Sequence, residues 1–118
     1  MKIGDTMLTN DAKFLMAKIY QNYIEKRKSG ATKRDAKFVG DVEEIHQKIM
    51  SQWMLDDVLD TCFELKSHNF LSGNPGSNSL FDIMITNEGI AIMETSFRDK
   101  ANAVLEYATK IKSLIPFI

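Results

Sequence analysis

Few side chains in this sequence of 118 residues have the type and spacing that catalysis requires. The only cysteine, Cys62, has Asp60 and Glu64 beside it rather than a cation, so its thiolate is disfavoured. The two histidines, His46 and His68, complete no zinc-protease motif. We therefore predict a protein that is not an enzyme, with no catalytic residues, no metal and no cofactor.

Three carboxylates, Asp56, Asp57 and Asp60, form a second group that could do chemistry, as ligands of a cation. No other oxygen ligands accompany them at the spacing of a calcium-binding loop. Asp56 and Asp57 instead suit the first turn of a helix, where carboxylates interact favourably with the helix dipole. We expect these side chains to be structural.

The cations are unevenly distributed along the chain. Residues 1–50 carry ten Lys and Arg against seven Asp and Glu, whereas residues 51–118 carry five against nine. The densest basic stretch comprises Lys26, Arg27, Lys28, Lys33, Arg34 and Lys37. Two interpretations are open: a solvated helix end whose cations complement the helix dipole, or a patch that contacts phosphates.

The overall composition indicates one folded domain in a reducing compartment. Hydrophobic residues make up 44% and charged residues 26%, which is typical of a globular chain. The net charge of -1 argues against a protein held on nucleic acid or a membrane by bulk charge alone. A single cysteine cannot form a disulfide within the chain. No apolar run has the length of a signal peptide or of a membrane-spanning helix. We expect a cytoplasmic protein with no membrane partner.

Apolar residues recur at steps of three and four up to His68, which predicts helices. The predicted segments are Asn10–Lys28, a short helix between Thr32 and Gly40 that includes Ala36, Phe38 and Val39, a segment that follows Asp41, and Leu55–His68. Thr9 or Asn10, Thr32 and Asp41 have the side chains of N-cap residues. The apolar stripe of the last helix comprises Leu55, Val58, Leu59, Cys62, Phe63 and Leu65.

Two short runs after His68 predict a β-hairpin with strands at about Asn69–Gly73 and Ser79–Thr86. The segment Asn74–Asn78 should form the turn, because Pro75 presets φ and Gly76 allows a positive φ. Alternation in the second run is typical of a half-buried strand. It should place three residues on one face: Phe81, Ile83 and Ile85.

Two more helices are predicted after the hairpin. One should follow the cap Thr86 and span Asn87–Phe97, and the other should span about Asp99–Ile115 before Pro116. The second helix carries small and apolar residues near a/d spacing: Ala101, Val104, Leu105, Ala108, Ile111 and Ile115. We predict a homodimer through this seam; the competing interpretation is that the seam covers the first helix of its own chain.

The element order from Trp53 to Glu94 resembles the winged helix-turn-helix superfamily, in particular its small bacterial and phage members. A helix leads into a hairpin, and Ile85-Thr86-Asn87-Glu88-Gly89-Ile90 is similar to the exit from the second wing strand in that family. The resemblance implies a mainly α fold with a small β-hairpin and an additional C-terminal helix. It divides the chain into an N-terminal extension (1–9), a winged-helix domain (10–97) and a C-terminal helix (98–118) that is the possible dimerisation element.

The resemblance also implies a function in binding double-stranded DNA, as a transcriptional regulator. The candidate DNA contacts are Lys33, Arg34 and Lys37 to phosphates, and Thr61, Lys66 and Ser67 at the groove. DNA binding would require these cations to converge on one face with the helix Leu55–His68. The alternative is a winged-helix protein-protein interaction module that does not bind DNA, in which the acidic helix contacts a basic protein partner.

Overall fold

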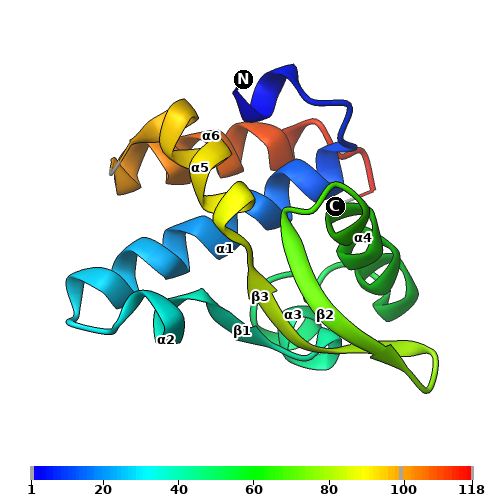
Figure 1. Cartoon of the computed structure of the whole chain (residues 1–118). Helices are drawn as coiled ribbons and strands as arrows, with labels where there is room; N and C mark the ends of the chain where they lie inside the picture. Colours follow the sequence, from blue (N-terminus) through cyan, green and yellow to red (C-terminus); the bar gives the residue numbers. More distant parts are fainter. Residues whose placement is uncertain (1, 99, 118) are drawn as a thin grey trace.

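The computed structural model describes residues 2–98 and 100–117 and is mainly helical with a small antiparallel sheet (Figure 1). The helices are η1 (Ile3–Asp5), α1 (Asn10–Lys28), α2 (Lys33–Lys37), α3 (Val42–Lys48), α4 (Leu55–Ser67), α5 (Asn87–Phe97) and α6 (Ala101–Ser113). The strands are β1 (Phe38–Gly40), β2 (Leu71–Gly76) and β3 (Ser79–Ile85), in the order β1-β3-β2. None of the described helices is long and apolar enough to cross a membrane.

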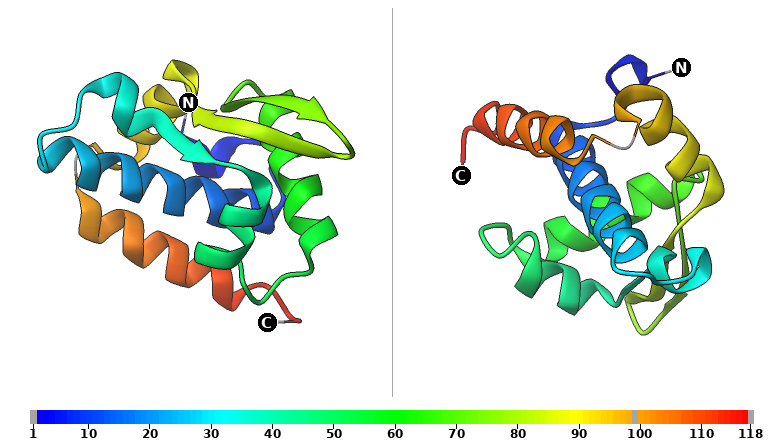
Figure 2. Two further views of the ribbon diagram at one scale, coloured as in Figure 1. Left: turned by 90° about the horizontal axis from the view of Figure 1, so that it is seen from below. Right: turned by 90° about the vertical axis from the view of Figure 1, so that its left-hand side faces the viewer.

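Helix α1 is the central element, and its apolar residues are buried along its whole length. It begins where predicted, because the hydroxyl oxygen of Thr9 accepts a hydrogen bond from the Ala12 amide at 3.2 Å. Helix α6 runs beside it in the opposite direction (Figures 1 and 2). The single hydrophobic core extends from Ile3 and Leu8, before α1, to Ile115, after α6.

The N-cap residues that the sequence predicts lie at the starts of α2, α3 and α5. The hydroxyl of Thr32 accepts from the Asp35 amide at 3.1 Å, and that of Thr86 accepts from the Gly89 amide at 2.9 Å. At α3 the Asp41 amide donates to the Glu44 carboxylate at 3.3 Å, so the helix has the backward bond of a capping box.

The helix predicted between Thr32 and Gly40 is wrong at its end, because Phe38–Gly40 forms the strand β1. Phe38 pairs with Met84 and Gly40 with Ile83 on β3, which gives the sheet a third strand. A strand of three residues is too short to show a period in the sequence. The conformation of β1 depends on its pairing with β3.

The hairpin is present, but its turn lies further along the chain than predicted. Ser77 and Asn78 have φ of 48° and 57°, which is the pattern of a two-residue type I′ turn. Pro75 pairs with Leu80 inside β2 instead of forming the turn. Proline is tolerated there because β2 is an edge strand.

A bulge at Asp82, where φ is 52°, overturns the predicted alternation in β3. The register passes from Ser72↔Met84 to Asn74↔Phe81, so β3 carries one extra residue. Leu80, Ile83 and Ile85 are therefore the buried residues of β3, whereas Phe81 is only half-buried. The Asp82 amide donates to the Asp41 carboxylate at 3.1 Å, which ties the bulge to the start of α3.

Candidate interaction surface

The side of α4 that faces solvent is the most distinctive surface of the molecule. Asp56, Asp60, Phe63 and Ser67 follow one another at steps of four, three and four, so they lie on one stripe of the helix. All four are exposed, and 37% of Phe63 is accessible to solvent. The opposite side is buried and comprises Val58, Thr61, Cys62 and Leu65. We call the first set the outer stripe of α4.

The outer stripe corrects the predicted apolar face of this helix. Leu55 and Phe63 were expected among the core residues, but both are exposed. A helical wheel identifies Phe63 once the buried side is known, because Phe63 lies about 140° from the buried Val58 and about 100° from Cys62. Phe63 lies beside Asp60 on this stripe and is not one of the buried core residues.

Helix α4 is held firmly against the rest of the chain. The Glu64 carboxylate accepts hydrogen bonds from the Thr9 amide at 2.8 Å and from the Thr9 hydroxyl at 2.7 Å. Before the helix, Trp53 is buried and stacks on Phe14 with ring centroids 5.1 Å apart. The outer stripe is therefore presented on a rigid support.

The α3–α4 unit, residues 41–67, is strongly acidic. It contains seven Asp and Glu against two Lys. One of the two, Lys48, lies 3.6 Å from the Glu44 carboxylate in an exposed ion pair. The surface formed by these two helices therefore carries a negative potential.

The opposite charge gathers at the end of α1 and in α2. Residues 26–37, here called the basic end, contain six Lys and Arg and one Asp. Two of the cations contact backbone carbonyls: Lys26 Nζ donates to Phe38 O at 2.7 Å, and Arg27 Nη1 donates to Ala31 O at 3.1 Å. No ion pair engages these cations within residues 2–98 and 100–117.

The structure does not bring the predicted DNA contacts together. Lys33, Arg34 and Lys37 belong to α2, which follows the end of α1, whereas Lys66 and Ser67 lie near its start (Figure 1). The 19 residues of α1 between the two groups span roughly 28 Å. The cations of α2 are therefore separated from the end of α4 by roughly the length of α1.

Thr61 is not available to a groove of DNA, contrary to prediction. Only 3% of this residue is exposed, and its hydroxyl donates to Asp57 O at 2.7 Å. Its position on the buried side of α4 turns it toward the core, so the polar side chain is satisfied by its own helix.

The tip of the hairpin carries no cation. Asn74, Ser77 and Asn78 are exposed, and the Asn74 amide nitrogen donates to the Asp82 carboxylate at 3.2 Å. The polar groups of the tip are suited to hydrogen bonding rather than to neutralising phosphate charge.

The seam predicted for dimerisation is buried within the chain. Val104, Ala108, Ile111 and Ile115 are each at most 6% exposed, and Ala101 packs against the same core. Only Leu105 of the six candidates is exposed, at 43%. In the structure α6 covers α1 of its own chain, as the competing interpretation held. A dimer through the seam is not supported.

Cys62 lies on the buried side of α4, where its thiol is not accessible to solvent. Burial raises the pKa of its thiol to about 12, so the thiol stays protonated at neutral pH.

His68 is exposed, and its Nδ1 lies 3.0 Å from Glu64 O at the end of α4. No group of three His, Cys, Asp or Glu side chains in the described part of the chain could hold a metal ion.

The chain has also been compared with known proteins. It matches no family model, no curated protein and no solved structure.

Proposed function

We propose that this chain is a winged-helix protein-binding module whose outer α4 stripe contacts a basic partner that carries apolar side chains. The order of helix, strand, two helices and hairpin, with β1 beside β3, supports the winged-helix assignment. In that fold α4 is the helix placed to meet a ligand. The buried thiol of Cys62 suits a reducing, cytoplasmic setting.

The acidic outer stripe is the observation that carries this proposal. A duplex presents about one phosphate charge per 1.7 Å, and a protein gains affinity by neutralising phosphates with Lys and Arg. Asp56 and Asp60 would instead face those phosphates with charge of the same sign. The α3–α4 unit therefore disfavours docking on DNA.

The same stripe suits a protein partner. Phe63 follows Asp60 by three positions, so an apolar anchor lies beside carboxylates on the exposed side of the helix. Aromatic anchors supply much of the affinity of protein interfaces, and surrounding charges select the partner and speed its approach. An amphipathic segment rich in Lys or Arg has the complementary chemistry.

DNA binding as a transcriptional regulator is the second candidate, and the basic end favours it. Lys33, Arg34 and Lys37 are accessible or half-exposed and would contact phosphates, but without help from α4. Replacing Arg34 and Lys37 by Ala should then lower duplex affinity for all sequences and reduce the salt slope by about two. An unchanged salt slope, with K110A/K112A as the matched control, would remove this candidate.

A binding assay with designed peptides tests the first proposal. The probe is a helical peptide of Lys and Leu, and its control is the same peptide with Glu in place of Lys. We expect the cationic peptide alone to bind, and F63A to weaken it about tenfold. F117A removes another exposed phenylalanine, 63% accessible, and should change nothing. Equal binding of both peptides, or no effect of F63A, would contradict the proposal.

A further inference from the structure

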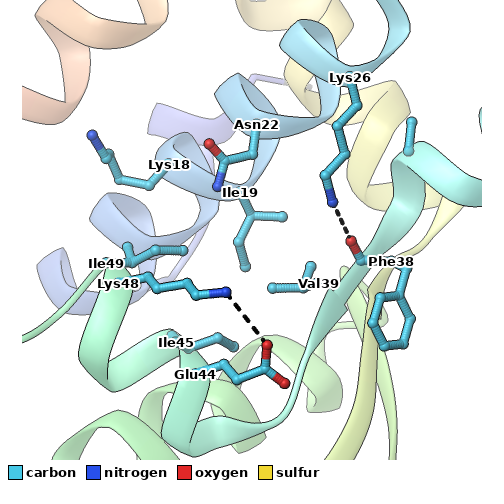
Figure 3. Close-up of a pocket in the computed structure, with 11 residues that line it drawn as sticks. Lys18, Ile19, Asn22, Lys26, Phe38, Val39, Glu44, Ile45, Lys48 and Ile49 are labelled. Atoms are coloured by element: carbon cyan, nitrogen blue, oxygen red, sulfur yellow. Dashed lines mark hydrogen bonds and ion pairs between the residues drawn. The ribbon is translucent and has the colours of Figure 1, made fainter. Parts of the chain in front are cut away.

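A cavity of about 280 Å³ lies between α1, β1 and α3 (Figure 3). It is separate from the outer stripe of α4, and none of its lining residues belongs to that stripe. Its volume is just below the range of about 300–1,000 Å³ that is usual for small-molecule sites. A ligand that fills it must be small.

The floor of the cavity is apolar. Ile19 of α1 and Ile45 of α3 are buried, and Val39 and Ile49 are partly buried around them. These branched aliphatic side chains provide a surface for a hydrocarbon group but no hydrogen bonds. The body of a ligand seated here should therefore be apolar.

The rim of the cavity is mainly cationic. The ammonium groups of Lys26 and Lys48 reach toward the space from α1 and α3, and Asn22 of α1 also lines it (Figure 3). Lys18 also lines the cavity, but its ammonium group points outward. The only carboxylate of the lining is Glu44.

Both inward cations keep hydrogen-bond donors that a ligand could engage. Lys48 Nζ pairs with Glu44 at 3.6 Å, and both side chains are highly exposed, so this ion pair contributes little stability. Lys26 Nζ donates to the neutral carbonyl of Phe38 at 2.7 Å and has further protons to donate. A carboxylate placed between them would form two charge-assisted hydrogen bonds.

We propose that this cavity is a binding site for a small carboxylate with an apolar body, such as a short fatty acid. The carboxylate contacts Lys26 and Lys48, and the hydrocarbon chain lies on Ile19, Val39 and Ile45. This site does not depend on the proposed function of α4, because it uses different elements.

Titration of the intact chain with three matched ligands tests this site, with amide NMR signals of α1, β1 and α3 as the readout. The ligands are hexanoate, its neutral analogue hexanamide and the cation hexylammonium. We expect hexanoate to bind about tenfold more tightly than hexanamide, as a charge-assisted hydrogen bond allows. Hexylammonium should not bind, because the rim is mainly cationic. Equal shifts by hexanoate and hexanamide, stronger binding of hexylammonium, or no shifts at all would overturn the proposal.

Two substitutions locate the site without disturbing the core. K48Q removes one of the two inward cations and should reduce the preference for hexanoate over hexanamide, whereas K110Q on α6 should leave it unchanged. N22W covers the mouth of the cavity from an exposed position of α1 and should block both ligands. Unchanged hexanoate binding by K48Q and N22W, in variants that melt like the wild type, would place the ligand elsewhere.

Discussion

The first forty residues and the α3–α4 unit carry net charges of opposite sign that cancel each other in the whole chain. Residues 1–40 contain nine Lys and Arg against four Asp and Glu, whereas residues 41–67 contain two against seven. The net charge of -1 therefore conceals two separate surfaces. Helix α4 lies on the acidic one, so the net charge alone does not describe the surface that a partner of α4 would meet.

The largest expected effect distinguishes the two sides of α4. L65A removes a fully buried side chain and should lower the free energy of unfolding by about 3 kcal/mol. F63A, on the exposed side, should cost about 1 kcal/mol or less and still abolish most peptide binding. Chemical denaturation of L65A and F63A measures the two free energies of unfolding. A loss in F63A as large as that in L65A would mean that Phe63 is a core residue.

Reversing the charge of the outer stripe should make α4 resemble the basic end. D56K/D60K should weaken binding of the Lys and Leu peptide at least about tenfold and strengthen binding to random duplex DNA. The matched control, E94K/E106K, makes the same change in net charge on α5 and α6. If both double variants bind DNA equally, the effect comes from total charge and the comparison of surfaces fails.

The buried thiol of Cys62 should make the free energy of unfolding depend on pH. The Cys62 thiol has a pKa of about 12 in the folded chain and an ordinary pKa of about 8.5 when unfolded. The unfolded state then loses its proton first, so this contribution to stability is complete below about pH 8.5 and falls between there and pH 12. At pH 10 the loss should be about 1–2 kcal/mol relative to neutral pH. C62A, denatured at both pH values, should lack this component, and an identical pH dependence in both proteins would show that the thiol is accessible.

The smallest expected effect concerns the hairpin tip, which belongs to neither charged surface. Asn78 has a φ of 57°, so N78G relieves the left-handed conformation and should change the free energy of unfolding by only a few tenths of a kcal/mol. Peptide binding should not change. A loss of peptide affinity in N78G would show that the binding surface extends from α4 to the hairpin.

Local signals made most of the helices predictable. The hydroxyls of Thr9, Thr32 and Thr86 act as N-caps on neighbouring amides, and such contacts depend on residues three positions apart. The strand β1 and the bulge at Asp82 depend instead on pairing between distant segments. No window of the sequence contains that information.

The candidate surface was only partly predictable for the same reason. The acidic character of α4 follows from Asp56 and Asp60 in the sequence, whereas the exposure of Phe63 depends on which side of the helix packs on the core. The seam of α6 shows the limit most clearly. Its spacing predicts an apolar contact, but whether the partner is α1 or a second chain is decided by tertiary packing.

The central claim, that the acidic α4 surface and not the basic end is the recognition surface, is tested most directly by mapping one ligand on the whole molecule. Amide NMR spectra of the wild-type chain would be recorded during titration with the Lys and Leu peptide. We predict the largest shifts at Asp56, Asp60 and Phe63, with α2 unaffected. Shifts confined to Arg34 and Lys37, or none at α4 up to saturating peptide, would contradict the claim.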